Sequence, residues 1–369
     1  MSQASQSPRP GLQDLEWYRT MRNTEPVWQD PNTGFWNVFR YQDVAVVLAD
    51  YRTFSSDVSQ VFPDMAKRIE GNLIGTDPPY HRQLRHLVSQ AFTPRAIARL
   101  EAHIEELTEE LLDQTQGRTQ IELISDLAYP LPVTVIAELL GVPSTADPSR
   151  FKSGAEFRDL LRDHIGQRRI EPRQDLLSGL VAAEIDGQRL SDQEIVGFVA
   201  LLLHAGHITT TALLGNAILC LDEHPQAQDT LRADPAAIPG AIEEVLRYRS
   251  PIARIERVTT TEVQLGEQVI APRKMLNVWL LSANHDERQF ENPEDFVIDR
   301  HPNPHVGFGR GIHFCLGAPL ARLESKIALG VLLRRFSQLR IDPERSLELY
   351  AASFGINGVR RLHLLAEPA

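Results

Sequence analysis

The residues best suited to chemistry lie in the stretch from Phe308 to Gly317, which reads FGRGIHFCLG. Its Cys315 is one of only two cysteines, and no disulfide accounts for its position. Glycines bracket it, and glycine permits positive φ angles and the close approach of another body. Pro319 is suited to the first turn of a following helix, whose unpaired N–H groups and positive dipole end favour a thiolate. Such a thiolate beside a flat apolar body would be a good axial ligand to iron. The bracketing glycines are Gly309, Gly311 and Gly317.

The spacing of the residues in this stretch is long and specific. Phe308, Gly311, His313, Cys315 and Gly317 form the pattern F-x-x-G-x-H-x-C-x-G. This pattern resembles the haem-binding loop of the cytochromes P-450. The resemblance implies that Cys315 ligates haem iron, where an axial thiolate pushes electron density onto the metal and favours O–O cleavage. The alternative is a buried free cysteine in a glycine-rich turn.

Composition excludes several classes of partner. The chain of 369 residues is 42% hydrophobic and 24% charged, as is ordinary for a soluble protein with a sizeable core. A formal net charge of −11 argues against binding to nucleic acid or to an anionic membrane. Two cysteines far apart in the sequence suit a reducing compartment, and the N-terminus has no apolar targeting segment. We expect a cytoplasmic protein without a membrane anchor.

Hydrophobic periodicity predicts a mainly α protein with small β regions, an α+β class. The resemblance implies the cytochrome P-450 fold, with haem between a long central helix and the Cys315 loop with its following helix. We expect residues 1–369 to form one domain, with the β-rich part mainly in 25–60 and 252–280. The long helix should begin after Ser191, with Glu194 completing a capping box, and should cross the core. An amphipathic helix is predicted from Ile97 to Gln116, and a more apolar helix should end at Gly141.

Four basic side chains are candidates for holding the haem carboxylates. His81 and Arg85 are four residues apart on a predicted helix within TDPPYHRQLRHLV. This segment resembles the family's D-P-P-x-H-x-x-x-R segment, in which both residues contact a haem propionate. The resemblance assigns the other propionate contacts to Arg257 and His313, and two buried carboxylates do need paired charge. Without the Cys315 loop, His81 and Arg85 would be interpreted as an exposed pair on a solvated helix.

A structural ionic cluster is also predicted. Glu244 and Arg247 stand three residues apart, and Arg300 follows in FVIDRHPNP. They resemble the family's E-x-x-R pair, which a distant arginine closes into a buried cluster. Most isolated E-x-x-R pairs are surface salt bridges worth little.

The long helix carries a departure from the family. Residues 205–210 read AGHITT and resemble A-G-x-[DE]-T-T, but Ile208 replaces the acid that relays protons. Thr209 can hydrogen-bond to a carbonyl one turn earlier, which with Gly206 should open a groove for dioxygen. His204 should face the distal pocket, where it could ligate iron, shuttle protons or bind substrate. His204 and His207 could instead hold another metal, although no third ligand is apparent, or be hydrogen-bonded core residues.

The substrate pocket is predicted to be apolar. Its candidate lining residues are Leu201, Ala205, Ile252 and Phe354. The segment between Leu139 and Leu176 is about twenty residues shorter than the family norm, judged from the motifs on either side. Either the lid over the pocket is small or the sequence is incomplete there.

Together these features predict a haem-thiolate monooxygenase with haem b (iron protoporphyrin IX). It would insert one oxygen atom from O2 into an apolar small molecule, using electrons from a separate ferredoxin-type donor and its reductase. Thr209 and His204 are the catalytic candidates. Ile208 motivates a second hypothesis, a peroxygenase driven by hydrogen peroxide. A third is a haem-binding or sensor protein with His204 at the distal iron site.

Overall fold

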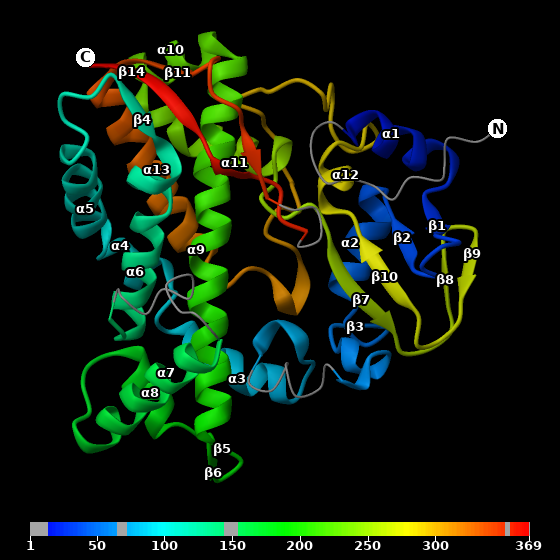
Figure 1. Ribbon diagram of the computed structural model, residues 1–369. Coiled ribbons are helices and arrows are strands. Elements are labelled where there is room, and N and C mark those ends of the chain that lie inside the picture. The colour runs from blue at the N-terminus through cyan, green and yellow to red at the C-terminus, as the bar shows by residue number, and fades with distance from the viewer. Residues whose placement is uncertain (1–13, 65–71, 144–153, 351–354, 369) are drawn as a thin grey trace.

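The computed structural model describes residues 14–64, 72–143, 154–350 and 355–368. A large helical part lies on one side, and a smaller part built around a β-sheet lies on the other (Figure 1). The helices are α1 (Leu15–Thr24), α2 (Tyr41–Ala49), α3 (Tyr80–Ser89), α4 (Pro94–Ala98), α5 (Glu101–Asp113), α6 (Pro130–Leu140), α7 (Gly154–Ile170), α8 (Leu176–Ala182), α9 (Asp192–Glu223), α10 (Pro225–Ala233), α11 (Ile238–Tyr248), α12 (Leu280–Asn284) and α13 (Ala318–Arg335).

The main sheet joins two segments that are distant in sequence. Its strand order is β1-β2-β10-β7-β3, with β2 and β10 parallel and the other neighbours antiparallel. A second sheet has the order β11-β14-β4, and three two-stranded ribbons pair β5 with β6, β8 with β9 and β12 with β13. The strands are β1 (Val27–Gln29), β2 (Trp36–Val38), β3 (Phe54–Ser55), β4 (Gln120–Glu122), β5 (Glu184–Ile185), β6 (Gln188–Arg189), β7 (Ile255–Thr259), β8 (Val263–Leu265), β9 (Gln268–Ile270), β10 (Met275–Val278), β11 (Phe336–Ile341), β12 (Glu348–Leu349), β13 (Val359–Arg361) and β14 (His363–Pro368).

Helix α9 is the central element of the helical part (Figure 1). It starts as predicted: the Ser191 side chain accepts from the Glu194 N–H, and the Glu194 carboxylate accepts from the Ser191 N–H, a complete capping box. The helix packs against α6, α11 and α13. Its length and apolar composition would also suit a membrane span, but 56% of the most apolar window is buried inside the protein. The sequence is therefore that of a core helix.

The predicted helix from Ile97 to Gln116 is wrong in its continuity. The chain forms α4, capped by the Thr93 hydroxyl, and then α5. Between them the Arg99 N–H bonds the Ala96 carbonyl three residues back, a tighter turn that ends the first helix. The apolar helix ends at Gly141 as expected, because Gly141 takes a φ of 79° as a left-handed cap.

Candidate functional site

The loop that carries Cys315 is folded tightly against α2. Gly309 and Gly311 have φ angles of 70° and 71°, where a side chain would be strained. A Cβ on Gly311 would lie 2.7 Å from the Leu48 carbonyl oxygen of α2. The Cys315 N–H donates to the Phe308 carbonyl at 2.9 Å, which closes the loop just before α13 begins. The loop thus presents Cys315 on a rigid turn.

The electrostatic state of Cys315 corrects one expectation. Burial raises the pKa of its thiol, and this outweighs the Gly317 and Ala318 N–H groups and the charges of Arg85 and Arg322, which act to lower it. The start of the helix therefore does not make a thiolate by itself. A bound cation at sulfur would supply the remaining stabilisation, because a metal deprotonates a coordinating thiol.

Three of the four predicted propionate contacts lie close together. The rings of His81 on α3 and His313 in the loop are 4.3 Å apart between centroids. Burial lowers the pKa values of Arg257, on β7, and of His313. Asp77, whose carboxylate is 3.7 Å from the His313 Nε2, acts to raise both. Burial, with the nearby charges of His313 and Arg85, lowers the pKa of His81 to about 4, so it is a neutral donor at pH 7.

Arg85 has a different partner. Its Nη2 donates to the Phe314 carbonyl at 2.7 Å, one residue before Cys315. In this structure Arg85 thus ties α3 to the Cys315 loop and adds positive charge near the sulfur.

The polar atoms of His81, His313 and Arg257 fit an anionic ligand. Arg257 is 5% exposed and donates to the carbonyl of Glu256, and within the described residues it has no carboxylate at ion-pair distance. Burial lowers its pKa to about 10, which leaves a buried cation. The Nε2 of His81 is buried without a hydrogen-bond partner in the same part of the chain. Buried charges and donors are normally satisfied, so this donor set suits a group that carries carboxylates, as haem does.

One face of α9 is open although most of the helix is buried. His204 is exposed, and three neighbours at helical spacing, Leu201, Ala205 and Ile208, are only half-buried. The Thr209 hydroxyl donates to the Ala205 carbonyl at 2.9 Å, as predicted from the sequence. Although the His204 side chain is exposed, the protein atoms around it partly desolvate the imidazole and lower its pKa, so the ring is neutral at pH 7.

Gly206 has a packing role beyond the predicted groove. A Cβ there would lie 2.8 Å from the Ile136 side chain of α6. Glycine therefore lets α6 approach α9 closely at this point. This contact adds a packing role for Gly206 to the groove for dioxygen, which stays a prediction.

The two histidines of α9 do not form a metal site with any third ligand in the part of the chain that is described. Their ring centroids are 5.9 Å apart. The His207 Nδ1 lies 2.6 Å from the Leu203 carbonyl, and the His207 ring makes an edge contact with Tyr129. His207 is thus a hydrogen-bonded core residue.

Glu244, Arg247 and Arg300 come together. Arg247 binds both oxygens of Glu244 at 2.7 and 2.9 Å, and the Arg300 Nε lies 3.1 Å from the Glu244 Oε1. Glu244 and Arg247 are fully buried. Arg247 also donates to three backbone carbonyls, those of Asn284, Pro293 and Asp295.

Sequence reasoning missed Glu324 on α13. It is 1% exposed, and neither carboxyl oxygen has a hydrogen-bond partner among the described residues. Burial raises its pKa to about 8, against a smaller opposing effect of the Thr210 hydroxyl of α9. The signal was available, because Glu324 stands four residues after Leu320 and three before Ile327, both on the buried face.

Two predicted pocket residues remain to be placed. Ile252 forms an isolated β-bridge with Ile356, so it lies where the C-terminal segment meets the β part. Phe354 lies outside the described residues, as does part of the short segment between Leu139 and Leu176.

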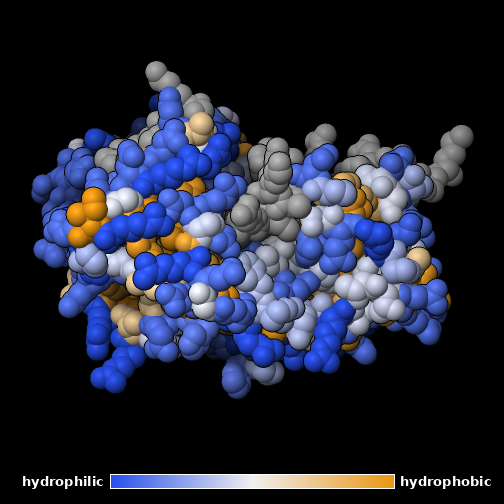
Figure 2. Space-filling view, turned by 90° about the horizontal axis from the view of Figure 1, so that it is seen from below, coloured by the Kyte–Doolittle hydropathy of each residue, from blue (hydrophilic) through white to orange (hydrophobic). Residues whose placement is uncertain are grey.

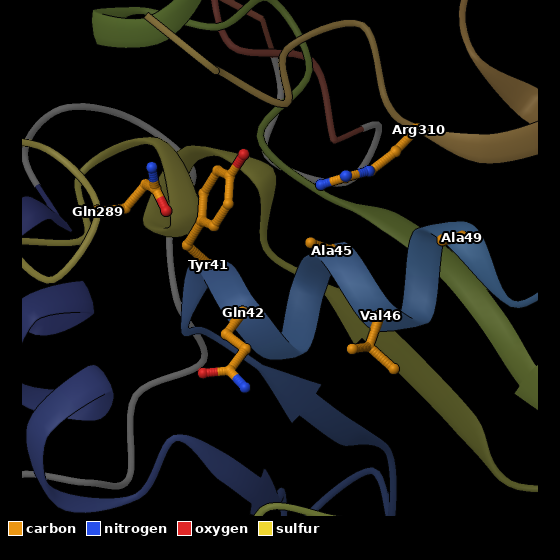
Figure 3. Close-up of a pocket in the computed structure, with 7 residues that line it drawn as sticks. All are labelled: Tyr41, Gln42, Ala45, Val46, Ala49, Gln289 and Arg310. Atoms are coloured by element: carbon orange, nitrogen blue, oxygen red, sulfur yellow. The ribbon is translucent and has the colours of Figure 1, made fainter. Parts of the chain in front are cut away.

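A surface groove of about 540 Å³ lies beside the Cys315 loop, away from these pocket candidates. Arg310 reaches over α2 towards Tyr41, with Ala45 below and between them (Figure 3). Arg310 is exposed, and within the described chain it has no ion-pair partner. The view from below the molecule is largely hydrophilic, with apolar side chains gathered mainly on its helical side (Figure 2).

Comparison with known proteins gives consistent matches. A family model described as cytochrome P450 matches residues 155–355. Erythromycin C-12 hydroxylase of Saccharopolyspora erythraea is 42% identical over 363 residues, covering 90% of each chain. Cyclomarin C epoxidase CymV of Salinispora arenicola is 42% identical over 353 residues, covering 88% of this chain and 89% of the relative. The solved structure of HmtN, a hydroxylase involved in himastatin biosynthesis, is 44% identical with a TM-score of 0.90, covering 96% of this chain and 97% of that one.

Proposed function

Because the chain belongs to the cytochrome P450 family it is a haem-iron monooxygenase, and we propose that it inserts one oxygen atom from O2 into an apolar small molecule with electrons from a ferredoxin-type partner. The observation that carries the proposal is a pair of buried donors beside the Cys315 loop. Among the described residues, Arg257 has no carboxylate at ion-pair distance and the His81 Nε2 has no hydrogen-bond partner. The relatives named above are hydroxylases and an epoxidase.

The residues of the proximal side would bind and orient the cofactor, which we propose is haem b. Thiolate-ligated haem supplies the activation of dioxygen. Cys315 would hold the iron, and the Phe308 carbonyl fixes the Cys315 backbone. Arg257, His81 and His313 would donate to the propionates. Arg85 would hold the loop through Phe314 and keep a positive charge near the sulfur.

The residues of α9 would manage protons and substrate. The Thr209 hydroxyl donates to Ala205, so its lone pairs remain free to accept a hydrogen bond from water. Ile208 can neither hold nor move a proton. His204 is neutral and exposed one turn away, so its imidazole would carry the proton that an acid carries in related proteins. Leu201, Ala205 and Ile252 would line the pocket.

The redox partner would dock beside the Cys315 loop. The groove at α2 lies against this loop. Arg310 lines it with a positive charge that has no ion-pair partner among the described residues, which suits an acidic iron–sulfur protein. We place the enzyme in the cytoplasm as a single domain, with its reductase on separate chains.

The first test concerns Cys315. The reduced holoenzyme with carbon monoxide should show the strongly red-shifted Soret band of thiolate ligation, and Cys315→Ser should abolish it. The control is Cys220→Ala, because Cys220 is fully buried in α9 and should cost about 1 to 3 kcal/mol of stability while haem is retained. An unchanged spectrum in Cys315→Ser would refute the assignment.

Two specific observations favour other functions. Ile208 suits a peroxygenase, which needs no acid relay, and exposed His204 suits a haem-binding sensor in which nitrogen ligates the iron. Product formed per electron pair should be low in the wild type and should rise in Ile208→Glu if oxygen activation by the usual route is limited by protons. His204→Phe should lower it further if the imidazole moves protons.

The same measurements separate the alternatives. Efficient turnover with hydrogen peroxide and none with redox partners would favour the peroxygenase. An increase of activity in His204→Phe, with loss of a nitrogen-ligated spectrum, would favour the sensor. Tight coupling in the wild type that neither change affects would show that neither residue delivers protons.

A further inference from the structure

Two adjacent acids on α11 serve different clusters. Glu244 points into the buried ion pairs with Arg247 and Arg300, whereas Glu243 binds Arg322 of α13. The Arg322 Nε and Nη2 lie 2.6 and 2.8 Å from the two Glu243 oxygens, a bidentate pair. Arg322 follows Cys315 by seven residues and lies in the second turn of α13. The second pair therefore links α11 to the helix that begins at the cysteine loop.

A histidine fixes the other side of Glu243. The His305 Nδ1 accepts from the Gly307 N–H at 3.2 Å, so a neutral ring carries its proton on Nε2. That Nε2 lies 3.0 Å from Glu243 and donates to it. Burial works against the Glu243 charge, but the hydrogen bonds from Arg322 and His305 outweigh it and lower the Glu243 pKa to about 2. Glu243 is thus a permanent anion that holds Arg322 in one place.

The held guanidinium faces the cysteine loop. The Arg322 Cζ lies 4.6 Å from the centroid of the Phe308 ring, within the range of a cation–π contact. The Phe308 carbonyl in turn accepts from the Cys315 N–H at 2.9 Å. The guanidinium thus stacks on the ring of the residue whose carbonyl holds the Cys315 backbone.

We propose that Arg322, anchored by Glu243 and His305 and stacked on Phe308, is a positioning residue that sets the charge behind the Cys315 thiolate and thereby the reduction potential of its iron. This inference rests on the proposed role of Cys315. Groups around a ligating sulfur tune its donation to the metal. A positive charge there stabilises the thiolate and the reduced iron, so it raises the potential.

The experiment measures the haem reduction potential of the holoenzyme. Arg322→Gln removes the positive charge and should make the potential more negative. Arg322→Lys keeps the charge and should stay nearer the wild type. The matched control is Arg334→Gln, on the same helix about 18 Å along its axis, where the arginine also pairs with acids of a neighbouring helix, Glu105 and Glu109. It makes the same change in net charge and should leave the potential unchanged.

Glu243→Gln provides an independent arm if Arg322→Gln does not retain haem. It removes the compensating anion while an amide oxygen still accepts from Arg322, so the potential should rise. The thiolate Soret band of the carbon monoxide complex should also be lost sooner in Arg322→Gln than in Arg334→Gln during storage.

The results distinguish this proposal from the assignment of Cys315. A wild type without the thiolate band would overturn both. A wild type with the band would keep Cys315 as ligand. The proposal on Arg322 would then be overturned by equal shifts in Arg322→Gln and Arg334→Gln, by no shift in Arg322→Gln, or by no rise in Glu243→Gln.

Discussion

The cluster around Glu244 and the group around His313 both bury charge, but only the first is built from matched protein partners. Glu244 meets two arginines, and Arg247 meets Glu244 and three carbonyls. Arg257 has no such carboxylate within the described chain, and His81 has a free buried nitrogen there. The cluster around Glu244 is satisfied by protein groups, so breaking it would destabilise the scaffold. The group around His313 is not satisfied by protein groups among the described residues, which suits the binding of a ligand there.

The largest effect is expected from breaking the satisfied cluster. Arg247→Ala leaves Glu244 buried with less compensation and should cost roughly 3 to 5 kcal/mol, seen as poor folding and low haem content. The control is Arg288→Ala, whose exposed arginine pairs with Asp286 and Glu287 and should cost less than about 1 kcal/mol. Chemical unfolding measures both. Equal free energies of unfolding for Arg247→Ala and Arg288→Ala would show that the buried cluster contributes no more than an exposed ion pair.

Glu324 extends the comparison to a buried acid that has no ion-pair partner among the described residues. Its pKa is about 8 when folded, against an ordinary value of 4.5. The folded state therefore binds the proton more tightly, so stability is highest below pH 4.5 and falls as pH rises towards 8. Relative to Glu324→Gln, the wild type should lose roughly 4 to 5 kcal/mol across this window. Unfolding at several pH values checks this, and a pH-independent difference would contradict the neutral buried acid.

In the group around His313, a substitution should affect the stability of the apoprotein and the affinity for haem differently. Arg257→Gln removes a buried cation, so the apoprotein should be as stable as the wild type or more so. Haem affinity should fall about 10- to 100-fold through the lost charged hydrogen bond. Haem transfer to a scavenger protein and unfolding of the apoprotein measure the two effects. Arg52→Gln, an exposed arginine, is the control and should change neither. A less stable apoprotein in Arg257→Gln would show that Arg257 stabilises the protein fold and does not serve haem binding alone.

The sequence was informative where local rules dominate. The capping box at Ser191, the left-handed cap at Gly141 and the Thr209 back-bond all follow from residue type and neighbours. Motif spacing identified the cytochrome P450 fold. The break after α4, by contrast, is a single tight turn that leaves the hydrophobic period intact, so periodicity could not detect it.

Charges were harder to predict because their state depends on three-dimensional burial. The Cys315 thiol was expected to ionise from its place before a helix, but desolvation dominates. Arg85 was assigned to a carboxylate from its helical spacing with His81. Its guanidinium also donates to the carbonyl of Phe314, a residue 229 positions later that the sequence could not place beside it. Gly206 could not be recognised as a contact with Ile136 before α6 was placed.

The parallel pairing of β2 with β10 also concerns how the chain is made. Residues 36–38 pair with residues 276–278, and Arg22 binds Ser282 and Glu287. During synthesis, strand β2 and the buried Arg22 therefore cannot form these contacts until most of the chain has left the ribosome. Contacts this distant close slowly and leave apolar surface exposed in the meantime. Chains released before about residue 280 should consequently aggregate or be degraded, whereas the helices from α9 to α11 can already pack among themselves.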